Sequence, residues 1–327
     1  MTINRVIHCV SISGGKDSAA TAILALETQP RESLRFIFCD TGNEHESTYE
    51  YVAYMGRHLG IEIVTLRAEF SGQIERKRAY ILEHWPRKGV PAEDVERAAA
   101  AMVPTGNPFL DLCIWKGRFP SRRAQFCTEQ LKTLPAVEYQ MGLIDSGLCD
   151  AVWSWQGVRI DESLSRRTRL ACPVNLAFSK FFEESGGGIY NYRPILRWNA
   201  GDVFEAAALY GLKPNPLYLQ GMSRVGCMPC INAGKDEILE ISKRFPGHID
   251  RIAYWEQCVA MASRRNGATF FALLNKGQDL TTQQHVEHGN IRKVVEWSNT
   301  QRGGQNLDWI RIMEEPKACQ SAYGLCE

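Results

Sequence analysis

The sequence VSISGGKDSAA, at residues 10–20, decides the fold, because an apolar run passes through two glycines into a segment of helix-forming residues. This order is typical of a strand, a phosphate-binding loop and a helix. Glycines let backbone N–H groups close around phosphate oxygens, and a helix N-terminus adds partial positive charge. We therefore expect an anionic ligand at this loop, with the candidate binding residues Ser11, Ser13, Gly14, Gly15, Lys16, Asp17 and Ser18.

The loop differs from a Walker A motif, since Lys16 is followed by Asp17 and the position five before Lys16 is Ser11 rather than glycine. It resembles the SGGxDS loop of the adenine nucleotide alpha hydrolase superfamily, which includes PP-loop ATP pyrophosphatases and the phosphoadenosine phosphosulfate (PAPS) reductases. The resemblance implies ATP or a sulfonucleotide as the ligand. A plain glycine turn between strand and helix would explain the two glycines but not the Asp17-Ser18 pair.

The composition is that of a globular protein. The chain has 327 residues, of which 44% are apolar and 23% charged, and its net charge of +1 gives no overall basic field. No run approaches the roughly 20 apolar residues of a membrane span, and the start MTINRVIHCV lacks the regions of a signal peptide. We expect a cytoplasmic protein with no membrane partner, in which some of the eleven cysteines serve metal or redox chemistry.

Apolar segments alternate with helix-like segments in the first part of the chain. Strands are predicted at residues 5–12, 34–40 and 61–66, and helices at 17–27 and 49–59. This alternation predicts an α/β fold with a doubly wound parallel sheet, Rossmann-like and of the HUP type, whose ligand lies at the carboxyl ends of the strands.

Asp40, Thr41 and Gly42 end the second predicted strand. Asp40 lies 25 positions beyond Gly15, which places an acid at the end of the neighbouring strand, within reach of ribose, magnesium or substrate. We therefore include these three residues in the candidate nucleotide site. The alternative is that Asp40 only opens a turn before Gly42.

Residues 68–123 break the alternation with two polar helical segments, 72–84 and 92–102, and we interpret them as an insertion beside the site. Its basic residues suit a polyanionic substrate, although solvated helix faces also produce such runs. They are Arg76, Lys77, Arg78, Arg87, Lys88, Lys116, Arg118, Arg122 and Arg123. The expected organisation is a nucleotide-binding domain over 1–230 and a mainly helical C-terminal region over 231–327.

Two further segments make the resemblance specific. Residues 127–135 place a cysteine before a Lys and a Pro, and residues 157–167 read GVRIDESLSRR, a GxRxxES element with a following Arg. Both are similar to motifs of the PAPS reductase family. The resemblance implies that Gly157, Arg159, Glu162, Ser163 and Arg166 shape the nucleotide site, because Arg offers a bidentate fork to phosphate or sulfate. The expected catalytic residues are Asp17, Asp40, Arg159 and Glu162.

Cys227 and Cys230 form a CxxC in a Gly/Pro-rich turn, which favours a metal over a redox dithiol, since redox pairs of the thioredoxin type open a helix. The pair supplies half of a tetrahedral site, and the remaining candidate ligands are Cys127, Cys319 and Cys326. All five are candidate metal ligands.

In the cluster-bearing branch of the family, the cysteine region before LKxxP and the CxxC jointly bind a [4Fe–4S] cluster near the nucleotide. Here position 126 is Phe, so only one cysteine stands where that branch has an adjacent pair. Cys319 or Cys326 would supply the fourth ligand, or one iron would stay open. A structural zinc site of Cys227, Cys230, Cys319 and Cys326 is the alternative.

Three functions agree with these features. The first is an ATP pyrophosphatase that adenylates an acceptor and transfers sulfur, with Mg²⁺ offsetting phosphate charge and with DNA, tRNA or a small molecule as acceptor. The second is a sulfonucleotide reductase that releases sulfite, although the chain ends YGLCE rather than in the ECGLH-like motif of such enzymes. The third is a non-catalytic nucleotide-binding module. A sulfur donor or reductant protein is an expected partner, and the oligomeric state stays open.

Overall fold

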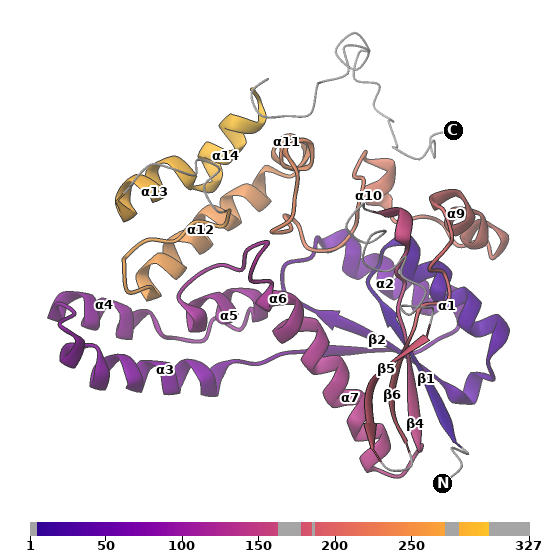
Figure 1. Cartoon of the computed structure of the whole chain (residues 1–327). Helices are drawn as coiled ribbons and strands as arrows, with labels where there is room; N and C mark the ends of the chain where they lie inside the picture. The colour runs from indigo at the N-terminus through magenta and orange to yellow at the C-terminus, as the bar shows by residue number, and fades with distance from the viewer. Residues whose placement is uncertain (1–4, 163–177, 185–186, 272–280, 301–327) are drawn as a thin grey trace.

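The computed structural model describes residues 5–162, 178–184, 187–271 and 281–300 (Figure 1). Its centre is a six-stranded sheet in the order β3-β2-β1-β4-β6-β5. The strands β3, β2, β1, β4 and β6 run parallel to one another. The edge strand β5 is antiparallel to β6. The strands are β1 Val6–Ile12, β2 Leu34–Asp40, β3 Ile63–Arg67, β4 Ala151–Trp155, β5 Phe178–Glu184 and β6 Gly187–Tyr192. The predicted doubly wound α/β fold is confirmed.

Helices cover both faces of the sheet, so its strands are apolar on both sides. Val10 and Ile12 of β1 pack with α1 (Lys16–Thr28) and α2 (Glu46–Leu59). Ile7 and Cys9 point the opposite way and pack with residues of α7 (Leu134–Asp145). The period of two along the strand thus assigns alternate side chains to two separate cores.

The last two strands form an antiparallel pair in which Glu184 of β5 lies opposite Gly187 of β6. Gly187 and Gly188 begin β6, although glycine more often marks a loop, and β6 ends at Tyr192. A Cβ at position 187 would lie 1.7 Å from the carbonyl oxygen of Asp150. Glycine is therefore required where the backbone of β6 starts beside that carbonyl, and the same residue that signals a loop permits a strand here.

The remaining helices lie beyond the sheet's carboxyl edge or beside α1. They are α3 Ser71–His84, α4 Ala92–Ala101, α5 Pro108–Lys116, α6 Phe126–Thr128, α9 Ala200–Leu209, α10 Pro216–Leu219, α11 Lys235–Arg244, α12 Pro246–Ala262, α13 Thr282–Gly289 and α14 Ile291–Ser298. Short turns are η1 Arg31–Ser33, η2 Pro86–Lys88, the π-helical η3 Glu129–Thr133 and η4 Ile160–Glu162. None of the helices among the described residues combines the length and the apolar character that crossing a membrane requires.

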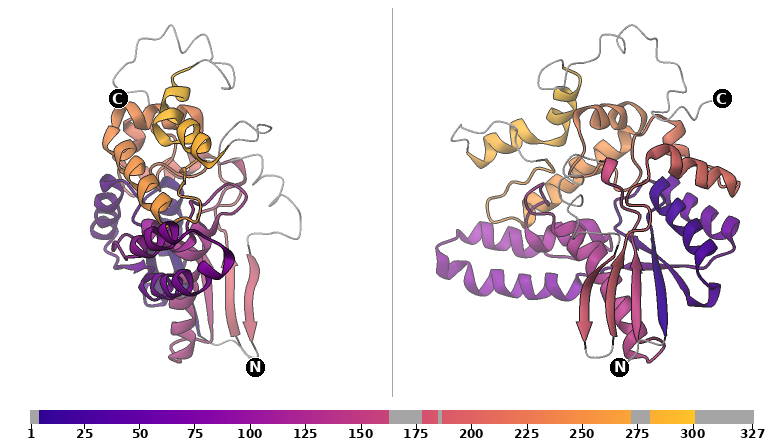
Figure 2. Two further views of the ribbon diagram at one scale, coloured as in Figure 1. Left: turned by 90° about the vertical axis from the view of Figure 1, so that its left-hand side faces the viewer. Right: turned by 45° about the vertical axis from the view of Figure 1, so that its right-hand side comes forward.

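The insertion helices and the C-terminal helices share one apolar core, which is distinct from the cores of the sheet. Ile74 and Ile81 of α3 and Leu112 of α5 belong to it together with Ile252 and Val259 of α12. Figures 1 and 2 show α3, α4 and α5 projecting from one side of the sheet, with α12 to α14 above them. The insertion and the C-terminal helices, which are far apart in the sequence, thus form one helical body.

Arg97 of α4 ties this body together at the end of α12. Its guanidinium donates hydrogen bonds to the carbonyl oxygens of Ala260 (3.2 Å), Met261 and Ser263 (3.1 Å), and to the Asp94 carboxylate at 2.7 Å. One side chain therefore satisfies carbonyls that the end of a helix leaves without partners.

We predict that Arg97→Ala lowers the free energy of unfolding by about 2 kcal/mol, because it removes hydrogen bonds from a charged donor and leaves helix-end carbonyls unpaired. Urea denaturation measures the change. The control is Arg87→Ala, which breaks an exposed ion pair with Glu83 and should cost less than about 0.5 kcal/mol. Equal losses in the two variants would contradict the bridging role of Arg97.

Candidate functional site

The loop between β1 and α1 closes on its own hydroxyl groups. The Ser13 N–H donates to Ser18 Oγ at 3.1 Å, Ser18 Oγ donates to the Gly15 carbonyl at 2.8 Å, and the Gly15 N–H donates to Ser13 Oγ at 3.4 Å. Gly14 has a φ of +73°, and a Cβ there would lie 2.8 Å from Thr48 Cγ2. The loop therefore requires glycine at this position both for its conformation and for its contact with α2.

Two residues of a distant segment, which the sequence analysis missed, hold the same loop. Asn215 donates from Nδ2 to the Gly14 carbonyl at 3.0 Å, and the Tyr218 hydroxyl accepts from the Lys16 N–H at 3.1 Å. The Lys16 ammonium lies 5.2 Å from the centre of the Tyr218 ring. In the sequence, Asn215 before Pro216 predicts no more than a helix cap, which it also is.

Arg159 joins the GxRxxES segment to the loop. It is 3% exposed and donates to the carboxylates of Asp17 and Asp161, and to the Trp198 carbonyl at 3.4 Å. Burial opposes the charge of the guanidinium, but the two carboxylates outweigh it and raise the pKa of Arg159. The structure thus brings Arg159 and Asp17 together, with the Arg fork directed at carboxylates.

Gly157 allows this close approach. A Cβ at this position would lie 2.9 Å from both the carbonyl carbon and the carbonyl oxygen of Asp17. Glu162 ends the short turn η4 and is exposed. Ser163 and Arg166, the other two residues carried over from this motif, lie outside the described residues.

A cavity of about 480 Å³ opens at the carboxyl ends of β1, β2, β4 and β6. This is the edge at which doubly wound sheets bind ligands. Its lining includes the loop residues Ser11, Ser13 and Ser18, together with Gly157, Lys132 and Gln140. We call it the strand-end cavity. Ser11, Ser13, Ser18 and Gly157 were predicted from sequence, and Gln140 was not.

Asp40 points to a different part of the surface. Its carboxylate accepts from the Gly42 N–H at 2.9 Å and from the Tyr49 hydroxyl at 2.8 Å, and it pairs with Arg67 at 3.3 Å. It lines a second cavity of about 540 Å³ with Tyr49 and Thr65, between α2 and β3. The hydrogen bond from the Gly42 N–H is that of an aspartate that opens a turn, the alternative that the sequence left open, while Tyr49 and Arg67 contact the same carboxylate from α2 and β3.

Glu44, which the sequence analysis missed, connects the turn after β2 with the CxxC segment. This buried carboxylate accepts from the Thr41 N–H at 3.1 Å, the Thr41 hydroxyl at 2.6 Å and the Tyr49 hydroxyl at 3.2 Å. The Cys227 thiol lies 3.9 Å from its Oε1. Because Glu44 also lines the strand-end cavity, that cavity and the CxxC segment share one wall.

Lys132 lies at the same junction. It lines the strand-end cavity. The electrostatic interaction with Cys227 is the largest cause that raises the pKa of Lys132, and Glu44 and Cys230 raise it further, whereas burial lowers it. A positive charge thus stands between the cavity and the cysteines. Lys132 belongs to the LKTLP segment at residues 131–135, which was similar to a family motif in the sequence.

Cys127, Cys227 and Cys230 converge, and we call them the cysteine triad. Burial raises the pKa of the Cys227 thiol to about 12. Burial and then the charge of Cys230 raise that of Cys127. Cys319 and Cys326 lie outside the described residues.

The spacing of the cysteine triad is wider than a single zinc ion requires. Within the described ranges, the one group of three His, Cys, Asp or Glu ligand atoms that all lie within 4.8 Å of one another is His45, Glu46 and His248. At least one pair of the triad sulfurs is therefore further apart than that. Zinc–sulfur bonds of about 2.3 Å put two sulfurs about 3.8 Å apart in a tetrahedral site.

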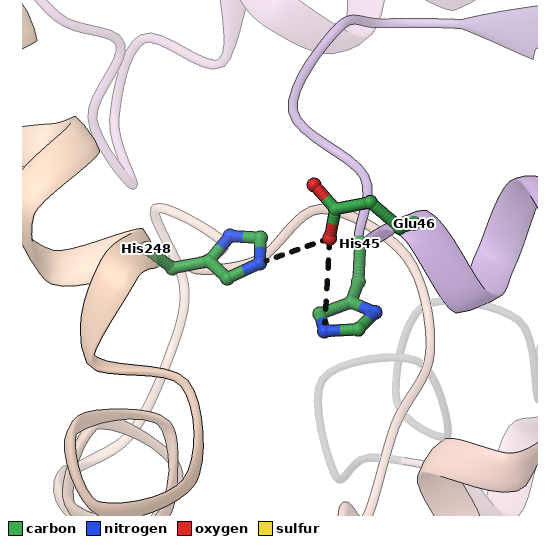
Figure 3. Close-up of side chains that lie close together, drawn as sticks. All are labelled: His45, Glu46 and His248. Carbon is green, nitrogen blue, oxygen red and sulfur yellow. Dashed lines mark ion pairs between the residues drawn. The ribbon is translucent and has the colours of Figure 1, made fainter.

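His45, Glu46 and His248 form a second cluster that the sequence did not predict (Figure 3). The two imidazoles stack with centroids 4.9 Å apart, and Glu46 Oε2 lies 3.8 Å from His45 Nε2 and 3.5 Å from His248 Nε2. His45 Nδ1 accepts from the Ser47 N–H, so its proton is on Nε2 and this ring offers no second lone pair. The cluster therefore joins α2 to α12 without presenting three metal ligands.

Comparison with known proteins follows the same motifs. The model of the phosphoadenosine phosphosulfate reductase domain matches residues 7–99 and 115–233. The chain belongs to this family. The residues matched by the PAPS reductase model include the loop after β1, the turn after β2, Arg159 and the CxxC pair.

Individual proteins are also similar to this chain. An uncharacterized 37.8 kDa protein from the gpa 5′ region of Escherichia phage 186 is 42% identical over 98% of this chain and 97% of its own length. An adenosine 5′-phosphosulfate reductase of Neisseria meningitidis is 35% identical over 22% of this chain and 30% of that enzyme. The solved PAPS reductase of Candida auris, a phosphate complex, gives a TM-score of 0.38 at 18% identity, covering 70% of this chain and 84% of that one.

The His45 and His248 pair predicts a pH dependence of stability. Burial is the largest cause that lowers the pKa of His248, from 6.5 to about 4. The charges of Arg251 and His45 lower it further, and the charge of Glu46 partly opposes them. The unfolded chain therefore binds this proton more tightly, and the stability that His248 contributes above pH 6.5 is lost as the pH falls towards 4. One pKa unit is about 1.4 kcal/mol, so the loss is roughly 3 kcal/mol at most.

Urea denaturation at pH 7 and at pH 4.5 measures this loss in the wild type and in His248→Asn, which keeps an N–H for the Met228 carbonyl. We expect the wild type to lose more stability than the variant over this interval. His285→Asn on α13 is the matched control and should behave as the wild type does. An identical loss in the wild type and His248→Asn would contradict the assignment.

Proposed function

We propose that this member of the PAPS reductase family is an adenine-nucleotide enzyme of sulfur metabolism, an ATP pyrophosphatase that transfers sulfur to a nucleic acid or a small acceptor. The observation that carries the proposal is the shared wall between the strand-end cavity and the cysteine triad, made by Glu44 and Lys132. A nucleotide in this cavity would have sulfur chemistry within the same centre.

The chain's own residues prepare the cavity for phosphates. The N–H groups of Ser13, Gly15 and Lys16 each donate to a hydroxyl group, from Ser18, Ser13 and Tyr218. Phosphate oxygens are stronger acceptors than these neutral hydroxyls, because an ionised acceptor makes a hydrogen bond roughly twice as strong. Bound phosphate would therefore replace the hydroxyls, with the N-terminus of α1 favouring its charge. Arg159 holds Asp17 in place beside this loop.

The proposed reaction has two steps, adenylation of the acceptor and transfer of sulfur. An oxygen of the acceptor attacks the α-phosphorus of ATP, the bond from that phosphorus to the β-phosphate bridging oxygen breaks, and pyrophosphate leaves. A sulfur nucleophile from the donor then displaces AMP from the adenylated acceptor. Mg²⁺, held by phosphate oxygens, would offset the charge that develops on the leaving pyrophosphate.

The cysteine triad suits a [4Fe–4S] cluster better than a single zinc ion, because of the wide spacing of its sulfurs. Cys127, Cys227 and Cys230 would hold three irons, and Cys319 or Cys326 remains the proposed fourth ligand. Such a cluster would supply electron transfer or a binding position for sulfur. Structural zinc is the alternative.

The match to the Neisseria adenosine 5′-phosphosulfate reductase favours a second candidate, a sulfonucleotide reductase. In that reaction a thiolate attacks the sulfur of the sulfonucleotide, the nucleotide leaves, and a reductant releases sulfite from the thiosulfonate. The strand-end cavity would bind the nucleotide in the same way. A nucleotide-binding module without turnover is the third candidate.

Product analysis separates these candidates. The protein is incubated anaerobically with tRNA or DNA as the acceptor, a thiol reductant, a sulfide source and either ATP or a sulfonucleotide. AMP, pyrophosphate and sulfite are then quantified. We expect AMP and pyrophosphate in equal amounts from ATP. Sulfite from the sulfonucleotide and no pyrophosphate would overturn the proposal in favour of the reductase.

Asp17→Asn tests the loop directly. It preserves the size of the side chain but leaves the buried Arg159 without one of its two carboxylate partners. Arg159 then no longer holds this side chain beside the loop, so we expect nucleotide affinity to fall by at least tenfold in isothermal titration with a non-hydrolysable ATP analogue, with circular dichroism confirming that the variant folds. Asp250→Asn, at an exposed ion pair with Arg292, is the matched control and should bind normally. Unchanged affinity in Asp17→Asn would count against this loop as the nucleotide site.

The metal is tested by analysis of anaerobically purified protein. We expect about four iron atoms and four acid-labile sulfides per chain, and loss of both in Cys127→Ser and Cys227→Ser. Cys258→Ser on α12 is the control and should retain the metal. One zinc ion and no sulfide would contradict the cluster.

A further inference from the structure

A shallow hollow of about 280 Å³ lies on the helical body, away from the strand-end cavity. It is lined by Gln73, Arg76, Lys77 and Tyr80 of α3 and by Trp115 of α5. We call it the basic–aromatic groove. Gln73, Lys77, Tyr80 and the nearby His84 follow one another at the spacing of one helix face, so the groove continues along α3.

Aromatic rings form the floor of this surface and cations lie over them. Tyr80 stacks on His84 with centroids 4.5 Å apart at 15°. The ammonium groups of Lys77 and Lys88 each lie 5.2 Å from the Tyr80 ring centre. Lys116 lies 3.6 Å from the Trp115 ring centre. Partly exposed aromatic rings of α3 and α5 and positively charged side chains thus lie next to one another on this surface.

The charge of the groove favours an anionic ligand. Arg76 lines it, Lys77 and Lys88 flank Tyr80, and Arg264 adds positive charge near the same ring. Glu75 precedes Arg76 in α3 but does not line the groove, and Glu83 is already paired with Arg87 and His84. The charged side chains that line the groove are thus positive, whereas the whole chain has a net charge of only +1.

The same pattern leads from the groove towards the cysteine triad. Lys116 follows Trp115, and two residues later the Arg118 guanidinium lies 5.6 Å from the Phe126 ring centre. Phe126 directly precedes Cys127 in α6. A ligand that follows these side chains would reach the wall that the cysteines share with the strand-end cavity.

We propose that the basic–aromatic groove binds single-stranded nucleic acid, with bases stacked on Tyr80 and Trp115 and phosphates held by Arg76, Lys77 and Lys88. An exposed cation–π contact is worth about 0.5–1 kcal/mol, whereas a base stacked on an aromatic side chain is worth about 1–3 kcal/mol. The strand would therefore displace the lysines from the rings and pair them with its phosphates. Paired bases in a duplex are not open to such stacking.

This inference rests on the proposed function only where it makes the strand the sulfur acceptor. The binding itself depends on the helical body alone. Strand binding and ATP cleavage are therefore measured separately on the same full-length protein, so that the failure of one is distinguished from the failure of the other.

Fluorescence anisotropy with labelled oligothymidine, labelled oligouridine and a labelled mixed-sequence duplex tests the proposal. We expect both single strands to bind more tightly than the duplex, with affinity that falls as salt rises. The stronger of the two single strands identifies DNA or RNA as the natural class. Equal or tighter binding of the duplex, or no binding of either single strand at low salt, would overturn the proposal.

Variants locate the binding. Tyr80→Ala should weaken single-strand binding by about 5- to 100-fold, from the loss of one stacking contact. Lys77→Gln should lower the slope of log affinity against log salt by about one phosphate contact. Lys243→Gln on α11 is the matched control and should change neither. Circular dichroism and nucleotide affinity should stay at wild-type values in all three. Single-strand affinity unchanged in Tyr80→Ala would contradict the groove as the binding surface.

Discussion

A buried carboxylate is the constraint on which the functional centre depends. Glu44 lies at 4% exposure, where an ionised group without hydrogen bonds would be costly, and Thr41 and Tyr49 satisfy it. Its position fixes the turn after β2 against Cys227, and the backbone bridge between Glu44 and Cys227 reinforces the contact. The same turn binds the CxxC segment through Asn43, whose carbonyl accepts from the Met228 N–H at 2.8 Å and whose Nδ2 donates to the Pro229 carbonyl at 3.0 Å. The strand-end cavity and the cysteine triad therefore share this turn.

The sheet and the helical body contribute different parts of the candidate site. The sheet presents the loop between β1 and α1 at the edge where parallel strands end, and glycines at positions 14 and 157 allow neighbouring segments to approach that loop. The helical body, built from the insertion and the C-terminal helices, adds Cys127 and the basic–aromatic groove. The proposed nucleotide and the proposed strand would thus approach the same cysteines from two sides.

Local signals in the sequence predicted the first strands of the sheet and the glycine loop between β1 and α1, because each depends on residue order within a few positions. The approach of Arg159 to Asp17 followed from the family resemblance instead, since the two residues are 142 positions apart. Contacts between distant segments left no such signal. Asn215 reaches the Gly14 carbonyl from 201 positions away, and His248 meets Glu46 across two helices. The orientation of Asp40 was also open, since an aspartate at the end of a strand can face a ligand or open a turn. It accepts from the Gly42 N–H of the turn and also contacts Tyr49 of α2 and Arg67 of β3.

The most direct test of a joint nucleotide and metal centre is an anomalous diffraction map, measured at the iron edge from anaerobically grown crystals soaked with a non-hydrolysable ATP analogue. The account predicts phosphate density against residues 13–18 and an iron signal among Cys127, Cys227 and Cys230. Phosphate density in the cavity between α2 and β3, or a metal signal remote from the cysteine triad, would contradict it.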